Sequence, residues 1–189
     1  MGMTVQRRKD TRTPRVFMHK IADIRGGVSV NSSELGSDWL PEGAVISQPV
    51  NGICHVVKVA EVSAAVDASG KTITVKKGSL FNVGDFVLLN VGDKASKITA
   101  IDRSGKTADK ITIDAALGVI GIGGFITEAS AASSTTTSAL KYEPFAVVGT
   151  GKPILPNDNI NTDAWVIGVT KGNPLPECVA SKLKGIINY

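Results

Sequence analysis

Residues 62–90 have the sequence VSAAVDASGKTITVKKGSLFNVGDFVLLN, and residues 97–129 have the sequence KITAIDRSGKTADKITIDAALGVIGIGGFITEA. Both stretches contain the motif D-x-S-G-K-T, which starts at Asp67 and again at Asp102. Each motif follows a short apolar segment and precedes a segment in which apolar and polar residues alternate, the pattern of a half-buried β-strand. Each copy then passes through a glycine-containing connection into another apolar segment. The sequence therefore predicts the internal duplication of a three-stranded unit.

Two three-stranded units that bring their apolar faces together predict a small β-barrel of about six strands at residues 62–129. In the first copy, Ile73 and Val75 are expected to face the interior of the barrel, and in the second copy Ile111 and Ile113 take these places. Glycines in the connections allow the tight corners that a small barrel needs.

The two regions that flank the barrel carry local signals for β-structure and for one helix. The pair Asn51-Gly52, between two apolar runs, predicts a β-hairpin with a type I′ turn. Alternating apolar residues from Trp165 to Val169 predict a strand. Residues 174–185 predict a short helix, because a proline suits its first turn and Gly185 suits its end.

The chain is expected to have four parts. Residues 16–61 and 140–189 are each too small to form a hydrophobic core alone, so we predict that they form one β-rich base domain. The duplicated β-barrel, residues 62–129, is inserted into this base, and residues 130–139 form a Ser/Thr/Ala linker. A basic, flexible arm at residues 1–15 precedes the base. The predicted fold class is mainly β, with a short C-terminal helix.

The net charge of +4 on the 189 residues is concentrated at one end. Residues 1–25 hold seven Lys or Arg and two Asp side chains, for a net charge of +5, whereas residues 26–189 hold 14 basic and 15 acidic side chains, for −1. A solvated tail and a nucleic-acid contact are alternatives to partner docking, but a nearly neutral body with 5% aromatic residues disfavours a dedicated nucleic-acid reader. The cations predicted to dock onto a partner are Arg7, Arg8, Lys9, Arg12 and Arg15.

Residue types that catalyse reactions or bind metals are scarce. The two histidines and two cysteines lack the spacing of a structural zinc site, and free thiols fit a reducing compartment. Cys54 and His55 are adjacent on a predicted strand, so they point to opposite faces and cannot form a nucleophile–base pair. Both S-G-K-T segments lack the first glycine of a phosphate-binding loop and precede strands, so they are predicted to be turns. We expect no enzymatic activity, cofactor or metal.

No membrane contact is expected either. The longest largely apolar run, residues 115–126, is too short to span a bilayer. The basic N-terminal residues are not followed by the apolar segment of a secretory signal.

Two tryptophans are candidates for an interface between subunits, because tryptophan is enriched among interface anchors. These candidates are Trp165 and Trp39. For Trp165 the alternative is a core position, because it alternates with Ile167 and Val169.

The stretch LPNDNINTDAWVIGVTKGNPLPE, residues 155–177, resembles head-fibre and auxiliary capsid proteins of tailed bacteriophages, notably those of gut Bacteroidales, including crAss-like phages. The segments VGDFV, residues 83–87, and KITAI, residues 97–101, are similar to the middle region of the same family, so that the resemblance covers about residues 42–189. It implies a non-enzymatic virion protein, a homotrimer that contacts the major capsid protein on the outer surface of an icosahedral capsid. The chain has no long repetitive shaft, which favours a compact decoration or fibre-base protein over a fibre.

From this resemblance and from the charge distribution, we expect assembly in the cytoplasm of the host bacterium, with the base and the basic arm against the capsid and the barrel outward. The alternative is a surface-exposed module that adheres to host cells or binds a host surface glycan. The shortage of aromatic residues counts against sugar stacking in such a module.

Overall fold

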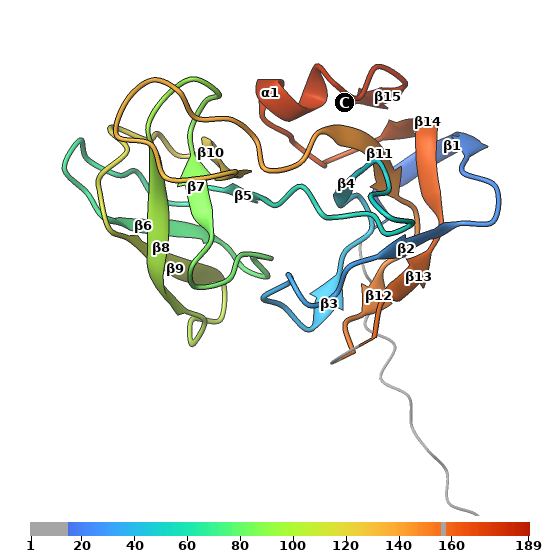
Figure 1. The fold of residues 1–189 in the computed structure, drawn as a ribbon, viewed down its shortest axis with the longest axis horizontal. Coiled ribbons are helices and arrows are strands. Elements are labelled where there is room, and N and C mark those ends of the chain that lie inside the picture. Colours follow the sequence, from blue (N-terminus) through green and yellow to red (C-terminus); the bar gives the residue numbers. More distant parts are fainter. Residues whose placement is uncertain (1–14, 156–157) are drawn as a thin grey trace, which may run out of the picture.

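A computed structural model of the protein describes residues 15–155 and 158–189. Four of the five cations predicted to dock, Arg7, Arg8, Lys9 and Arg12, lie outside the described residues. The described chain is mainly β, as the sequence predicts, with fifteen strands and one short helix near the C-terminus. The strands form two lobes (Figure 1), which we call the base lobe, residues 15–57, 140–155 and 158–189, and the inserted lobe, residues 58–139.

The base lobe is built from strands of both flanking regions. Its main sheet has the order β1 (Phe17–Asp23), β14 (Ala164–Thr170), β11 (Pro144–Val148) and β4 (Val45–Ser47), and β15 (Ile186–Asn188) joins β14 in parallel. Two further pairs are β2 (Val28–Val30) with β13 (Ile160–Thr162) and β3 (Trp39–Leu40) with β12 (Lys152–Pro153). Each of the four strands from the first flank therefore pairs with a strand from the second flank.

The core of the base lobe lies on both faces of its main sheet, because successive side chains of a strand point to opposite faces. In β11, Ala146 and Val148 belong to one buried cluster, and Val147 belongs to another.

The predicted hairpin is confirmed: Asn51 and Gly52 have φ values of 52° and 82°, which a type I′ turn requires.

The inserted lobe is a six-stranded sheet around its own core. Its strands have the order β5 (Val59–Glu61), β10 (Phe125–Ala129), β7 (Phe86–Leu88), β8 (Ala95–Asp102), β9 (Ala108–Ile113) and β6 (Thr72–Lys76). The four residues predicted to face the interior are buried in this core; they are Ile73, Val75, Ile111 and Ile113.

The two edges of this sheet touch at one point. Val62 and Val75 form an isolated bridge, and the backbone N–H of Ser63 donates to the carbonyl oxygen of Thr74 at 2.8 Å. The sheet curls until β5 and β6 meet, but no continuous ladder joins them, so that a fully closed barrel stays a prediction.

The pairing order of the inserted lobe supports the predicted duplication. β5, β6 and β7 come from the first copy, and β8, β9 and β10 from the second. The corresponding strands of the two copies are β5 and β8, β6 and β9, and β7 and β10. When each strand is exchanged for its counterpart, the pair β5–β10 becomes the pair β8–β7, which is also present in the sheet, and the pairs β10–β7 and β9–β6 are unchanged. The first strand of the first copy begins at Val59, slightly before the predicted boundary at residue 62.

Two segments differ from the sequence-based expectation. Within residues 130–139, predicted as a linker, the backbones of Ser133 and Ala95 exchange hydrogen bonds of 2.9 Å, so that the segment is packed onto the inserted lobe. The helix α1 is confined to Glu177–Ala180 and is followed by β15. Gly185 permits a close approach to β14, because a Cβ atom there would collide with the carbonyl oxygen of Val166.

No helix in the described ranges has the length and apolar character to cross a membrane.

Candidate functional site

The two lobes meet at a group of charged and polar side chains, which we call the junction cluster. The chain enters the inserted lobe at Lys58 and leaves it after residue 139. The backbone N–H of Glu128 donates to the carbonyl oxygen of Lys58 at 3.0 Å, and the backbone N–H of Lys141 donates to the carbonyl oxygen of Glu128 at 3.2 Å. Entry and exit therefore lie on either side of Glu128, and residues from both lobes converge on them. The members of the cluster are Glu34, His55, Lys58, Asp85, Glu128, Lys141 and Tyr142.

Lys58 is the centre of the junction cluster. Its Nζ donates to Oδ2 of Asp85 at 2.6 Å and to Oε1 of Glu128 at 3.2 Å. The side chain of Lys58 is 1% exposed and that of Glu128 is 2% exposed, so that solvent screens these contacts little. Strand β10, which carries Glu128, runs between β5 and β7. Lys58 immediately precedes β5 and Asp85 immediately precedes β7, and this register brings both side chains to Glu128.

Glu128 is a buried carboxyl group with two cationic neighbours. Its Oε1 also accepts a hydrogen bond from Nζ of Lys141 at 2.9 Å, whereas its Oε2 has no partner among the described residues. Burial raises the pKa of Glu128, and the opposing effect of Lys58 and Lys141 does not cancel the rise. Because a raised pKa makes the carboxylate a stronger base, this side chain is suited to accept a proton inside a closed site.

The other half of the junction cluster is organised by Glu34 of the base lobe. The hydroxyl group of Tyr142 donates to Oε1 and Oε2 of Glu34 at 2.9 and 3.0 Å, and Nδ1 of His55 lies 3.0 Å from Oε1. The rings of His55 and Tyr142 stack with their centroids 4.4 Å apart. The carbonyl oxygen of Glu34 accepts from Nδ2 of Asn82 at 2.9 Å, and the backbone N–H of Asn82 donates to Asp85 at 2.7 Å. Glu34 thus links the base lobe to the acidic partner of Lys58.

Tyr142 gives the junction cluster a measurable titration. Burial and then the hydrogen bond to Glu34 raise the pKa of Tyr142 to about 12. Because the folded pKa exceeds the unfolded value, the stability that Tyr142 contributes is fully present below a pH of about 10. This contribution is lost as the pH rises from there to about 12. We expect a tyrosinate absorbance step near that pH, which the substitution Tyr142→Phe removes and Tyr189→Phe retains. A high-pH step that survives in Tyr142→Phe would contradict the assignment.

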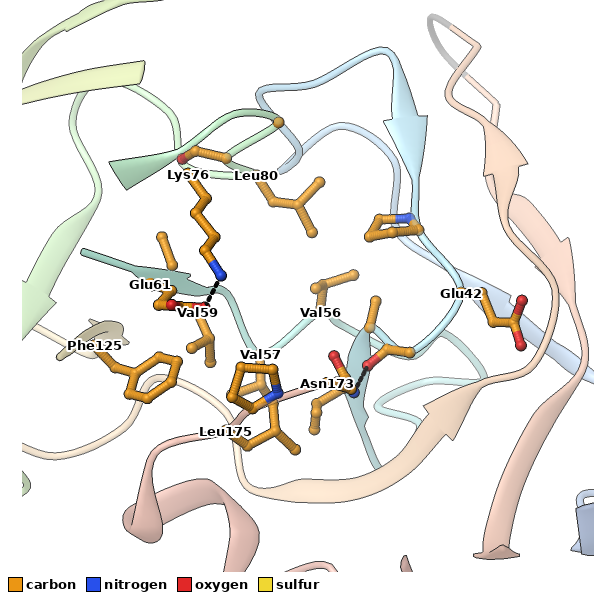
Figure 2. Close-up of a pocket in the computed structure, with 18 of the residues that line it drawn as sticks. Glu42, Val56, Val57, Val59, Glu61, Lys76, Leu80, Phe125, Asn173 and Leu175 are labelled. Atoms are coloured by element: carbon orange, nitrogen blue, oxygen red, sulfur yellow. Dashed lines mark hydrogen bonds and ion pairs between the residues drawn. The ribbon is translucent and has the colours of Figure 1, made fainter. Parts of the chain in front are cut away.

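A groove of about 270 Å³ lies between the lobes on another side of the junction (Figure 2). The labelled apolar side chains on its walls are Val56, Val57, Val59, Leu80, Phe125 and Leu175. Two pairs of polar groups in Figure 2 are hydrogen-bonded to each other: Nζ of Lys76 donates to Oε2 of Glu61 at 2.5 Å, and Nδ2 of Asn173 donates to the carbonyl oxygen of Gly43 at 3.0 Å. We assign no catalytic group to this groove.

The outer strands of the base lobe carry a concentration of exposed apolar side chains. Five of the twelve large exposed apolar residues in the described chain lie on β1 and β14 or in the C-terminal segment that follows α1. Met18 and Ile21 fall at shifts in the register between β1 and β14, where a bulge can turn a side chain outward. We call this group the base patch; its members are Met18, Ile21, Ile167, Ile187 and Tyr189.

The structure places the remaining candidates from the sequence in different settings. Arg15 is exposed at the start of the described chain. Trp39 is exposed on β3. Trp165 is half-buried: its ring lies 6.3 Å from that of Phe17, and its Nε1 donates to Oδ2 of Asp163 at 2.8 Å. Trp165 therefore packs at the border of the base core, which was the alternative to an interface anchor.

The sequence reasoning missed the junction cluster, because its members are far apart in the chain. The one local signal is Lys58, a single charged residue within the apolar run HVVKVA. In the described ranges, no group of three or more His, Cys, Asp or Glu side chains is arranged to hold a metal ion. The chemistry that the site offers is that of a buried amine held against two carboxyl groups.

No protein-family model, curated protein or solved structure gives a match to this chain.

Proposed function

We propose that this protein is a structural component of a bacteriophage virion that decorates the outer surface of the icosahedral capsid. In this proposal the base lobe docks onto the major capsid protein, the inserted lobe faces outward, and the protein assembles as a homotrimer in the cytoplasm of the host bacterium. The role is non-enzymatic. The sequence resemblance of residues 155–177 motivates the proposal, and the position of the base patch supports the orientation.

The base patch is the observation that carries the docking proposal. β1 and β14 lie on the side of the base lobe that faces away from the inserted lobe (Figure 1). β1 begins two residues after Arg15, so that this exposed cation is close in the chain to Met18 and Ile21. Exposed apolar side chains on the neighbouring strands β1, β14 and β15, with Arg15 close by in the chain, suit a partner surface with an apolar centre and an acidic rim.

Docking is tested by co-sedimentation of the purified protein with undecorated capsids. We expect the triple substitution Met18→Ser, Ile21→Ser and Ile187→Ser to weaken association at least about tenfold, because each buried apolar side chain contributes about 1.5–3 kcal/mol. The control is Val119→Ser with Ile122→Ser on the inserted lobe, two side chains that are 74% and 73% exposed. Equal binding by both variants, or a monomeric chain that never sediments with capsids at low salt, contradicts the proposal.

The alternative function, adhesion to host cells or to a surface glycan, has one supporting observation. Val119 and Ile122 lie in the connection between β9 and β10 and are the two most exposed large apolar side chains of the described chain. The same pair of variants separates the two functions. Loss of host-cell binding in the Val119/Ile122 variant, with capsid docking intact, indicates an adhesive inserted lobe.

A further inference from the structure

Lys58, Asp85 and Glu128 hold one amine in contact with two carboxyl groups. An amine and a carboxyl group, Nζ of Lys58 and Oδ2 of Asp85, are held 2.6 Å apart, and a second carboxyl group lies 3.2 Å from the same nitrogen. When two reactants are fixed in contact, the entropy that they would lose on meeting in solution has already been lost. Their effective concentration is therefore high, and a large part of the barrier to joining them is removed. Little water reaches the site, because the side chains of Lys58 and Glu128 are almost fully buried and that of Asp85 is 14% exposed.

We propose that Lys58 and Asp85 form an intramolecular amide bond, with Glu128 as the group that transfers the proton. In water, an amine and a carboxylic acid favour the separated ions, because both charges are well hydrated. In a buried site each charge loses that hydration, so that a neutral amide that releases one water molecule becomes the preferred product.

The reaction balances without an oxidant, a reductant or a cofactor. Glu128 accepts a proton from the Lys58 ammonium group, and the lone pair of Nζ then attacks Cγ of Asp85. The new C–N bond forms, one Cγ–O bond breaks, and the oxygen leaves as water. Two of the three ammonium protons depart with that oxygen, and Glu128 delivers one of them, while the third proton stays on the amide nitrogen. Glu128 ends in its starting state, as a general acid–base catalyst does.

The contacts favour Asp85 over Glu128 as the partner that becomes bonded. The distance from Nζ of Lys58 is 2.6 Å to Asp85 and 3.2 Å to Glu128. Glu128 is also held by Lys141 at 2.9 Å, whereas its second oxygen has no partner in the described chain and is free to exchange a proton. The raised pKa of Glu128 agrees with this proton-transfer role.

The amide bond would fasten the inserted lobe where the chain enters it. It closes a covalent loop from Lys58 to Asp85, which contains β5 and β6 and ends at the start of β7. Such a loop restricts the unfolded chain, as a disulfide of the same span does.

The test is the intact mass of the purified, full-length protein, measured under denaturing conditions. We expect the mass to be lower than that of the linear sequence by one water molecule, and tandem mass spectrometry of a protease digest to find the Lys58 peptide joined to the Asp85 peptide. The substitutions Lys58→Met and Glu128→Gln should each restore the full mass. Circular dichroism shows whether these variants are folded.

The ion pair between Lys76 and Glu61 is the matched control within the same chain. Its atoms are 2.5 Å apart, but the Lys76 side chain is 63% exposed, so that hydration keeps both charges stable. We expect the peptides that contain these two residues to be unlinked. The full, undehydrated mass in the wild-type protein after prolonged incubation overturns the proposal. A water loss that persists in Lys58→Met, or a bond from Lys58 to Glu128, overturns it as well.

Discussion

Replacing Asp109 by alanine is expected to lower the free energy of unfolding by about 3 kcal/mol. The Asp109 carboxylate is fully buried and accepts from Nζ of Lys77 at 2.8 Å and from the backbone N–H groups of Gly78 and Ser79 at 3.1 Å each. Alanine removes every acceptor, so that two backbone N–H groups of the turn after β6 lose their partners. Lys77 is partly exposed, and water compensates much of its loss.

Urea unfolding of Asp109→Ala measures this effect, and Asp114→Ala is its control. Asp114 accepts similar bonds from Ser96 at 2.5 Å and from the backbone of Lys97 at 3.1 Å, but it lies at the surface, so we expect a loss of about 1 kcal/mol. Equal losses in the two variants would show that burial of the Asp109 contacts does not matter.

The stability that Asp109 contributes is also expected to depend on pH. Burial by itself raises the pKa of Asp109, but the hydrogen bonds from Lys77, Ser79 and Gly78 outweigh it and hold the pKa below 3.8. Because the folded pKa is lower than the unfolded one, the stabilisation is present above pH 3.8 and is lost as the pH falls through the folded pKa. Asp109→Ala should therefore lose less stability than the wild type when both are titrated into this acidic range.

Replacing Gly36 by alanine is expected to cost about 3 kcal/mol and to loosen the contact between the lobes. Gly36 donates its backbone N–H to the carbonyl oxygen of Leu80 at 3.0 Å, which ties the base lobe to the inserted lobe. A Cβ atom at Gly36 would collide with the carbonyl oxygen of Phe81 and lie 2.7 Å from Nη2 of Arg103. The backbone oxygen cannot move aside without breaking its 2.6 Å hydrogen bond from the same Arg103 atom.

Calorimetry tests this prediction, because lobes that lose their contact should unfold in two steps instead of one. The control is Gly121→Ala, where a Cβ atom meets nothing within 4 Å and the backbone is outside the left-handed region. We expect this control to stay within about 0.5 kcal/mol of the wild type. A single transition at the wild-type temperature in Gly36→Ala would refute the tight contact.

The sequence predicted the parts of the fold that depend on near neighbours. The alternation of Ile73 with Val75 and of Ile111 with Ile113 gave the interior face of the inserted lobe, because a strand repeats every two residues. Asn51-Gly52 gave the hairpin, since few other pairs adopt positive φ at both positions. The helix was predicted too long, because Gly185 serves a close contact with β14 that the local sequence does not reveal.

The junction cluster could not be predicted from near neighbours in the sequence, because its residues are brought together by the order of the strands in the sheet. Lys58, Asp85 and Glu128 meet only because β10 inserts between β5 and β7, and that order depends on how the two copies interleave. A duplicated pattern predicts which segments are strands but leaves open which strand becomes the neighbour of which. Glu34 joins the cluster from a turn, closed by a 3.0 Å hydrogen bond from the backbone N–H of Leu35 to the carbonyl oxygen of Ser32, where the sequence carries no periodic signal.

The short separation between the points at which the chain leaves the base lobe and returns to it also makes the inserted lobe exchangeable. The chain leaves the base lobe at Lys58 and returns to it after residue 139. The backbone N–H of Glu128 donates to the carbonyl oxygen of Lys58 at 3.0 Å, and the backbone N–H of Lys141 donates to the carbonyl oxygen of Glu128 at 3.2 Å, so that the points of departure and return lie on either side of Glu128. Every strand of the main base sheet comes from outside the inserted segment. A foreign domain whose own ends lie about two strand spacings apart, about 10 Å, is therefore expected to fit between the same two points of the base lobe, so that the base lobe can carry different inserted domains.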